Sequence, residues 1–265
     1  MQTNTYQGLQ IINKKQSITT DELVIEAPLQ ININNESYTV VMRTPGNDQD
    51  LVLGLLYAED IYKNSLPIPF KIIEEKFNIP SIVNVTIESN HLGKGYLNKR
   101  TLLSVSSCGI CGKKELDDIK VSGEKMEQKV NFSSEKLLNM FTSLQKYQET
   151  FKKTGGSHAA GIFNTKFKLL TLREDIGRHN AVDKCIGSLL QLNVLKNGIY
   201  LLVSGRVSYE IVSKAFLAKI PVIVAVSACS SMAVDFAKEF GICLIGFTRE
   251  NKMTVYANPC SLEKK

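Results

Sequence analysis

Hydrophobic and polar residues change their period along this chain, and the changes predict where strands and helices form. Residues 23–26 and 30–43 alternate between apolar and polar, which predicts strands of a hairpin that turns at Asn34-Asn35. Residues 51–60 place apolar side chains at helical spacing, and Asp48 precedes them as a candidate N-cap. Alternation returns at 82–87, so the pattern of the first hundred residues predicts a small α+β unit. Residues 1–20 are polar and are expected to be frayed.

After residue 133 the pattern becomes a regular succession of strands and helices. We predict a helix over 133–154, a hairpin of 159–163 and 167–172, helices over 181–190, 209–218 and 231–240, and strands over 199–203, 222–226, 243–247 and 255–257. Strands separated by helices of this length are typical of βαβ crossovers, with parallel strands in one sheet. The charged segment 120–130 is the best candidate linker. We therefore predict an α/β fold, α+β overall, with a small domain over 1–125 that ends in a cysteine loop and a second domain over 126–265.

Composition indicates a globular protein, and its net charge is a weak argument for an anionic ligand. The 265 residues are 43% hydrophobic, enough for a substantial core, yet no apolar run approaches the length of a membrane span. The N-terminus has neither the basic start nor the apolar stretch of a signal peptide, so a cytoplasmic protein without a membrane partner is expected. The net charge of +6 is spread along the chain without a basic block, which favours a phosphorylated ligand over a nucleic acid.

Cys108 and Cys111 lie two residues apart in a glycine-bracketed loop, Ser106-Ser-Cys-Gly-Ile-Cys-Gly-Lys-Lys114. Such a pair holds a metal, forms a redox dithiol or carries reactive sulfur. No second pair of cysteines or histidines at zinc-ligand spacing is present, so no structural metal is expected. A redox dithiol usually begins a helix within a βαβ unit, whereas this pair follows residues 101–105 in a glycine-rich loop. A mobile loop that presents a thiol to another protein fits better.

Three of the remaining cysteines have apolar or small neighbours. Six cysteines are too few for a disulfide scaffold in a chain of this length, and a reducing compartment keeps them as thiols. We expect Cys185, Cys229 and Cys243 to be structural thiols.

Three predicted strands are followed by loops that suit a phosphate ligand, namely 204–208, 227–231 and 247–252. Ligands of open α/β sheets collect beyond the carboxyl ends of parallel strands. Hydroxyl residues and glycine at helix starts leave backbone N–H groups for phosphate, and Arg206, Arg249 and Lys252 supply positive charge. Each loop alone is equally well explained by helix capping, but the three together predict a nucleotide-sized anion site.

Two histidines occur in segments that are rich in polar and turn-forming residues, 154–158 and 173–180. A lone histidine is more often structural, but His158 and His179 each lie beside glycine and near arginine or aspartate. Both are therefore kept as candidate site residues alongside the structural alternative. The candidate ligand-binding set is Ser204, Gly205, Arg206, Phe247, Thr248, Arg249, Glu250, Asn251, Lys252, His158 and His179.

Six motifs in order resemble those of the formate dehydrogenase accessory sulfurtransferases, the FdhD family. They are residues 43–48 (RTPGND), 107–113 (SCGICGK), 154–161 (TGGSHAAG), 173–184 (REDIGRHNAVDK), 204–206 (SGR) and 246–249 (GFTR). Each is a weak signature alone, whereas the ordered set is specific and spans nearly the whole chain.

The resemblance implies a sulfurtransferase that takes persulfide sulfur from an L-cysteine desulfurase. It delivers this sulfur to bis-molybdopterin guanine dinucleotide for formate dehydrogenase. Cys108 is then the expected persulfide carrier and Cys111 its companion, which either releases sulfur by forming a disulfide with Cys108 or only tunes it. The segment 247–252 is expected to contact the nucleotide part, with GDP as a mimic, and a homodimer is expected.

The resemblance also implies that the second domain is similar to the cytidine deaminase fold, a three-layer α/β/α arrangement. Deaminases hold zinc with His-x-Glu and Pro-Cys-x-x-Cys, whereas this chain has His158-Ala-Ala and no second CxxC. Deaminase activity and a catalytic zinc are therefore not expected. The competing interpretation is a non-catalytic molybdenum-cofactor chaperone for formate dehydrogenase, whose cysteines serve only as contacts.

Overall fold

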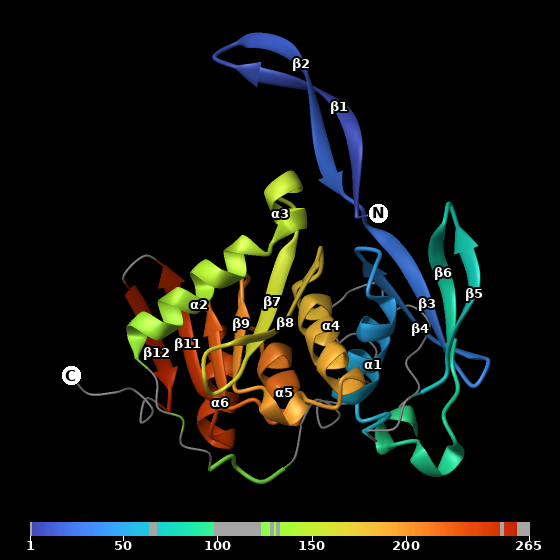
Figure 1. Ribbon diagram of the computed structural model, residues 1–265, viewed down its shortest axis with the longest axis vertical. Coiled ribbons are helices and arrows are strands. Elements are labelled where there is room, and N and C mark those ends of the chain that lie inside the picture. The colour runs from blue at the N-terminus through green and yellow to red at the C-terminus, as the bar shows by residue number, and fades with distance from the viewer. Residues whose placement is uncertain are drawn as a thin grey trace.

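The computed structural model describes residues 2–63, 68–97, 123–127, 130, 133–249 and 252–258. These residues form a two-stranded ribbon, a four-stranded sheet and a six-stranded sheet. Helices α1 and α4 lie side by side between the two larger sheets, and the ribbon stands out from the body (Figure 1). The mixed α+β architecture predicted from the pattern is confirmed.

The four-stranded sheet belongs to the smaller unit and has the order β4-β3-β6-β5. Its elements are β3 (Ala27–Ile33), β4 (Glu36–Arg43), α1 (Asp48–Ala58), β5 (Phe70–Lys76) and β6 (Ile79–Val85). The predicted turn is confirmed, because Asn34 and Asn35 join β3 to β4 with φ of 53° and 67°, values that asparagine tolerates well. Helix α1 buries Leu51, Val52 and Leu56 against the inward-facing residues of β3 and β6.

The six-stranded sheet has the order β12-β11-β10-β9-β7-β8. Its strands are β7 (His158–Phe163), β8 (Leu169–Asp175), β9 (Tyr200–Val203), β10 (Val222–Ala225), β11 (Cys243–Arg249) and β12 (Lys252–Ala257). The sheet is accompanied by α2 (Ser134–Lys146), α3 (Glu149–Thr154), α4 (Arg178–Gln191), α5 (Tyr209–Leu217) and α6 (Ser231–Phe240). Strands β9, β10 and β11 are parallel and β12 is an edge strand, as the pattern predicted, and the structure shows that β12 pairs antiparallel with β11.

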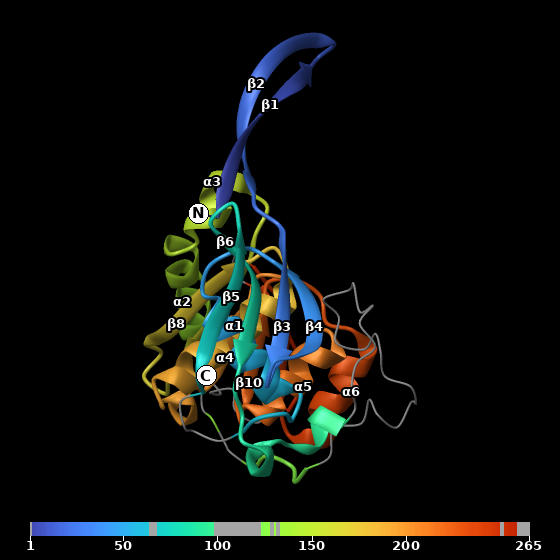
Figure 2. The same cartoon turned by 90° about the vertical axis from the view of Figure 1, so that its right-hand side faces the viewer.

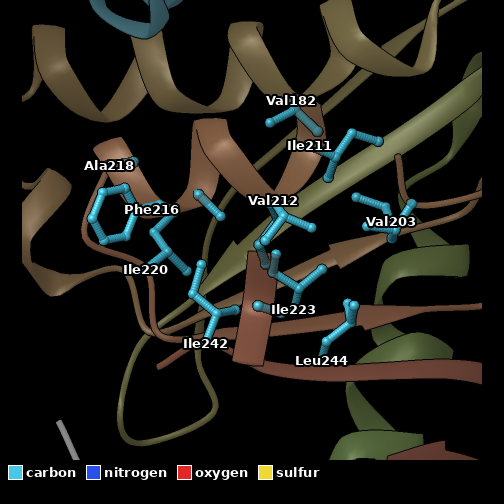
Figure 3. Packing of buried hydrophobic residues seen from close by; sticks show 14 of the residues in the cluster. Val182, Val203, Ile211, Val212, Phe216, Ala218, Ile220, Ile223, Ile242 and Leu244 are labelled. Carbon is cyan, nitrogen blue, oxygen red and sulfur yellow. The ribbon is translucent and has the colours of Figure 1, made fainter. Parts of the chain in front are cut away.

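Helices cover both faces of this sheet, which gives three layers. On one face α4, α5 and α6 pack against Ile162, Leu201 and Ile223, and Figure 3 shows α5 contributing Ile211, Val212 and Phe216 to this core. On the other face α2 buries its apolar stripe against Leu202, Val224 and other residues that alternate with the first set. Continuous burial of the parallel strands follows from coverage on both sides.

Helices α1 and α4 join the two sheets at an unusually close crossing. A Cβ at Gly54 would lie 1.9 Å from the Asp183 carbonyl oxygen, and one at Gly187 would lie 1.9 Å from the Asp50 carbonyl oxygen. Only glycine permits this approach, because any side chain would overlap the backbone of the other helix. The 125/126 domain boundary stays a prediction, but α1 of the first unit is packed directly on α4 of the second.

Three details of the predicted elements are wrong. The fraying predicted for residues 1–20 is wrong for the described residues from Gln2 onward, because β1 (Thr3–Ile12) and β2 (Lys15–Val24) pair in register as the ribbon. Asp48 does not cap α1: Asn47 occupies the cap without a side-chain bond, and the Asp48 carboxylate instead accepts bonds from the buried Arg43 guanidinium at 2.8 and 3.1 Å. A fully buried cation requires this counter-charge more than the helix requires its cap.

The predicted helix over 133–154 is interrupted between α2 and α3. The Glu174 carboxylate accepts bonds from the N–H groups of Thr150 and Phe151 at 2.9 and 2.8 Å and thereby starts a second helix. This partner is distant in sequence, so the local pattern shows no sign of it.

Candidate active-site edge

The loops that follow β9 and β10 are joined to each other and to the last residues of β11 by backbone hydrogen bonds. Val207 N donates to Ala228 O at 2.9 Å, and Ser230 N donates to Val207 O at 2.9 Å. Phe247 N in turn donates to Ser227 O at 3.0 Å. The structure therefore brings the predicted loops 204–208 and 227–231 together with the end of β11 at the carboxyl edge of the parallel strands, where α5 and α6 begin. The prediction that the segment 247–252 is a loop is wrong for its described residues, because 247–249 continue β11 and Lys252 begins β12.

Strands β7 and β8 add further residues to the same edge because β7 runs antiparallel to β9. Ser204 N donates to Ala159 O at 3.0 Å, and the Ser204 hydroxyl accepts from Ala159 N at 2.9 Å. The first residue of β7, His158, thus lies beside the 204–208 loop. Helix α4 begins at the same edge with Arg178, which follows the end of β8.

Gly205 allows His158 and Arg178 to approach this loop closely. A Cβ at Gly205 would lie 3.2 Å from His158 Nδ1 and 3.5 Å from Arg178 Cδ. The first of these distances is shorter than ordinary van der Waals contact for a Cβ. The predicted site residues Ser204, Gly205 and His158 therefore form one cluster, and Arg178 belongs to it.

His158 is partly buried and lies near two arginines. Burial lowers its pKa from the ordinary value of 6.5, and the guanidinium groups of Arg178 and Arg206 lower it further, while Asp175 acts in the opposite direction. Among the described residues, Arg178 Nε is buried without a hydrogen-bond acceptor. A buried N–H without an acceptor is costly, so this donor is suited to an anionic ligand at the edge.

The end of β11 presents a second group of candidate residues. Phe247 is 40% exposed with φ of 50°, and its ring lies 6.5 Å from that of Tyr256. Exposed Arg249 donates from Nε to Val226 O at 3.3 Å and pairs in register with Lys252. Buried Thr248 has no hydrogen-bond partner for Oγ1 among the described residues.

Glu250 and Asn251 were also predicted to contact the ligand, but they lie outside the described residues, and their roles stay predictions. The described part of the segment combines an exposed aromatic ring with two cationic side chains, Arg249 and Lys252. This combination suits a base and a phosphate.

His179 is placed differently from His158. It is 5% exposed, and its Nε2 lies 3.0 Å from the Ser208 hydroxyl and 3.1 Å from Glu210 Oε2. These partners lie at the start of α5, so the ring links α4 to α5. The contact of His179 with a ligand stays a prediction, while the structural alternative now has specific partners.

Most charged residues of the 173–184 motif hold the protein together. The Asp175 carboxylate accepts bonds from Thr44 N at 3.1 Å and Asn180 Nδ2 at 2.9 Å, and it pairs with Lys184 Nζ at 2.7 Å. Lys184 also donates to Thr44 O at 2.8 Å. Both partners of the ion pair are fully buried, and Thr44 belongs to the loop before α1.

Two more residues of the motif extend this network. Arg173 Nε pairs with Asp50 of α1 at 2.8 Å, and Asp183 pairs with Lys214 of α5 at 2.6 Å. The motif therefore connects β8 and α4 to both α1 and α5.

Cys108 and Cys111 lie outside the described residues, so their assigned roles stay predictions. Two of the described cysteines are poor nucleophiles, because burial raises the pKa of Cys185 to about 12 and that of Cys229 to about 11. Cys185 also donates to Ala160 O at 3.1 Å, and Cys243 is buried in the core. The structural role predicted for Cys185 and Cys243 agrees with this burial, and Cys229 is partly buried.

Within the described ranges, no three histidine, cysteine or acidic side chains gather as a metal site. The helices of the same ranges include none with the length and apolar character needed to span a bilayer.

Sequence comparison identifies relatives over most of the chain. The model of the FdhD/NarQ family matches residues 24–263. "Sulfur carrier protein FdhD" of Sulfolobus acidocaldarius is 42% identical over 241 residues, which cover 90% of each chain. The protein of the same name from Sulfurisphaera tokodaii is 36% identical over 97% of this chain and 98% of its own length.

Structural comparison agrees with the sequence match. A crystal structure from Desulfotalea psychrophila, provisionally described as a formate dehydrogenase accessory protein, superposes with a TM-score of 0.78. It covers 99% of this chain and 100% of its own at 19% identity, so it bears on the fold. Together with the family match, these observations show that the chain belongs to the FdhD/NarQ family.

Proposed function

We propose that this protein is a sulfur carrier in formate dehydrogenase maturation. As a sulfurtransferase of the cytoplasm, it accepts persulfide sulfur from an L-cysteine desulfurase and transfers it to bis-molybdopterin guanine dinucleotide. The observation that carries the proposal is the pair Cys108-Gly-Ile-Cys111 in a chain that is 42% identical to a named sulfur carrier. Two thiols at this spacing provide an acceptor for sulfur and a second thiol beside it.

The loading step exchanges one sulfur–sulfur bond for another. The Cys108 thiolate attacks the outer sulfur of the desulfurase persulfide, the desulfurase cysteine leaves as a thiolate, and Cys108 becomes a persulfide. Lys113 and Lys114 are close in sequence and favour the thiolate form if they fold nearby.

Delivery of the sulfur has two forms. In one, Cys111 attacks the inner sulfur of the Cys108 persulfide, forms a disulfide and releases the outer sulfur as sulfide. In the other, the outer sulfur passes directly from Cys108 to the substrate: the sulfur–sulfur bond breaks, Cys108 leaves as a thiolate, and the reduced metal centre of the substrate supplies the two electrons that convert the outer sulfur to sulfide. Cys111 then only tunes the reactivity of the persulfide.

The nucleotide part of the substrate fits the carboxyl edge of the large sheet. Arg178 offers a buried N–H without an acceptor among the described residues, and Arg206 and Arg249 add positive charge. The exposed ring of Phe247 provides a stacking surface for guanine. The three helix starts at this edge, those of α4, α5 and α6, orient backbone N–H groups and dipoles toward an anion.

The proposal is tested by loading the protein with a cysteine desulfurase and L-cysteine, followed by mass spectrometry of intact protein and peptides. We expect a gain of one sulfur on the peptide that contains Cys108. Cys108→Ala should abolish it without loss of GDP affinity, and Cys229→Ala should serve as the matched control, since that thiol is largely buried. A persulfide that persists in Cys108→Ala contradicts the assignment.

The second half of the experiment separates a transferase from a cofactor chaperone. The loaded protein is incubated with bis-molybdopterin guanine dinucleotide, and the sulfur content of the recovered cofactor is measured. We expect sulfur on the cofactor with wild type and none with Cys108→Ala. If Cys111→Ala delivers no sulfur, release proceeds through the disulfide. If Cys111→Ala still delivers sulfur, transfer is direct. A cofactor that gains no sulfur from the loaded wild type favours the chaperone.

A further inference from the structure

The N-terminal ribbon is an extended two-stranded sheet with both edges open among the described residues. Strands β1 and β2 pair antiparallel over ten residues each, and Asn13-Lys14 form the turn with φ of 49° and 67°. The ribbon projects well beyond the rest of the molecule in both views (Figures 1 and 2). A two-stranded hairpin is marginally stable in water, so this segment is suited to pairing with a further strand.

The base of the ribbon is fixed to the body of the protein. Gln2 accepts a bond from the Thr150 hydroxyl of α3 at 2.7 Å and donates to Pro45 O at 3.2 Å. Ile25 N donates to Gln2 O at 2.8 Å across the two ends of the ribbon. The ribbon is therefore held in direction at its base, and it lies almost entirely outside the residues that match the family model.

One face of the ribbon carries an exposed apolar cluster. Leu9 lies directly opposite Ile18, and Ile11 points to the same face two residues along β1. Their exposed fractions are 56%, 71% and 62%. These side chains lie in the half of the ribbon nearer the turn, between the second and the fourth residue pair from it, so a partner that covers them must contact this outer half.

The backbone of β2 offers hydrogen-bonding groups at the level of this cluster. A two-residue turn closes on the pair Ile12–Lys15, which exchanges hydrogen bonds, and such pairs alternate with pairs that do not. By this alternation the Leu9–Ile18 pair does not exchange bonds within the ribbon. The N–H and C=O groups of Ile18 therefore face the open edge of β2.

Charges on β2 and on the last residue of the turn before it, Lys14, are arranged symmetrically about Ile18. Lys15 lies three residues before it and Asp21 three residues after it, while Lys14 and Glu22 lie four residues before and after. In the described part of the chain, neither lysine forms an ion pair. The segment thus carries positive charge toward the tip and negative charge toward the base.

We propose that the open edge of β2 pairs with the same edge of a second copy of this chain, antiparallel and centred on Ile18. This two-fold pairing places Lys15 opposite Asp21 of the other copy and Lys14 near its Glu22, and both contacts occur twice. The result is a four-stranded sheet in the order β1-β2-β2-β1. The Leu9 and Ile18 side chains of both copies then form one apolar row across it.

The charges select this register over its neighbours. If the axis passes through Ser17, Lys15 lies opposite Thr19 of the other copy, and if it passes through Thr19, Lys15 lies opposite Leu23. Neither shifted register brings a lysine opposite an acidic residue. The docking surface is thus self-complementary only when Ile18 lies on the two-fold axis, and the proposal stands independently of the sulfur-carrier proposal.

Charge reversal tests the interface with the full-length protein in sedimentation velocity. We expect wild type to sediment as a dimer, and K14E/K15E and D21K/E22K each to have half that mass, because each variant brings like charges together. Mixed in equal amounts, the two variants should form a heterodimer, since the all-acidic strand then faces the all-basic one. Unchanged circular dichroism of each variant controls for folding.

The possible outcomes decide the proposal. A monomeric wild type, a dimer that survives both charge reversals, or variants that stay monomeric when mixed would each overturn it. Ile18→Cys examines the register, because two residues on the axis that exchange hydrogen bonds lie about 5.5 Å apart, within disulfide reach. We expect an Ile18→Cys disulfide-linked dimer on mild oxidation, mapped by peptide mass. Leu9→Cys, on the outer strand, should give none.

Discussion

Two polar regions of this protein use charged residues in opposite ways, although the 173–184 motif contributes to both. Between the two sheets, Asp175 and Lys184 are fully buried and paired. At the sheet edge, Arg178 and Arg206 form no ion pair among the described residues, and Arg178 Nε has no acceptor there. Charge in the first region fixes the relative position of the sheets, whereas charge in the second remains available to a ligand.

The comparison shows that charged residues of one motif can have different roles, some in holding the fold together and others in binding a ligand. A buried ion pair need not add stability relative to an apolar pair, but removal of one partner leaves an uncompensated charge. The two edge guanidinium groups pair with no carboxylate among the described residues, so the removal of either one leaves no buried counter-charge behind. Substitutions in the two regions should therefore differ in kind: those between the sheets affect unfolding, and those at the edge affect binding.

The largest effect is expected when Lys184 is truncated. Lys184→Ala leaves the Asp175 carboxylate buried without its cation, and we expect the free energy of unfolding to fall by about 3–5 kcal/mol. Urea unfolding followed by circular dichroism measures the change. The control Lys196→Ala, at an exposed site, should remain within about 0.5 kcal/mol of wild type. A Lys184→Ala protein as stable as wild type would remove the distinction between the two regions.

A smaller loss of stability is expected at the helix crossing. Gly54→Ala places a methyl group 1.9 Å from the Asp183 carbonyl oxygen, so α1 and α4 must separate. We expect a loss of about 1–3 kcal/mol despite the better helix propensity of alanine. Gly8→Ala is the matched control, because its methyl group would meet only Thr19 Cγ2 at 3.8 Å. If the two variants unfold at the same urea concentration, the crossing is not a tight constraint.

At the edge, Arg178→Ala should weaken GDP binding and leave stability nearly unchanged. Loss of one charge-assisted bond to phosphate is expected to raise the dissociation constant about tenfold, equivalent to about 1.4 kcal/mol. Isothermal titration calorimetry measures this change. Lys238→Ala removes a positive charge from the far end of α6 and should bind GDP like wild type. Equal affinities for Arg178→Ala and wild type would contradict the placement of the phosphate.

The sequence predicted the elements of this fold better than it predicted the partners of individual side chains. The strands and helices from residue 159 onward were identified because burial on both faces gives continuous apolar strands separated by amphipathic helices. The ribbon was missed because β1 and β2 are exposed on both faces and therefore lack apolar alternation. The break between α2 and α3 was missed because Glu174, which causes it, is distant in sequence.

For the candidate site, the loops after β9 and β10 and the end of β11 were identified from the rule that ligands gather at the carboxyl ends of parallel strands. Arg178 was missed, although it directly precedes His179 in the same motif. Sequence order alone does not show which of two adjacent residues at a helix start points to the edge and which points to the next helix. The structure separates them: Arg178 lies beside His158, and His179 contacts Ser208 and Glu210.

The smallest expected effect is a pH dependence that arises from His158. Burial and the two arginines hold its pKa below the ordinary 6.5 in the free protein, so the ring is neutral at neutral pH. A bound phosphate adds negative charge beside the ring and offsets the arginines, so the pKa of His158 in the complex should be higher than in the free protein. The complex then takes up a proton more readily, and by linkage its affinity must increase as pH falls.

The increase should begin as pH falls through the pKa of the complex and level off below that of the free protein. GDP affinity is measured by calorimetry between about pH 8 and about pH 5.5 for wild type and His158→Gln, a range that spans the titration of a histidine. The nucleotide's own titration is common to both proteins and cancels in the ratio of their affinities. We expect this ratio to rise severalfold in favour of wild type toward low pH. A ratio independent of pH would mean that the bound ligand does not change the pKa of His158. The anion would then have to lie nearer to Arg249 than to Arg178.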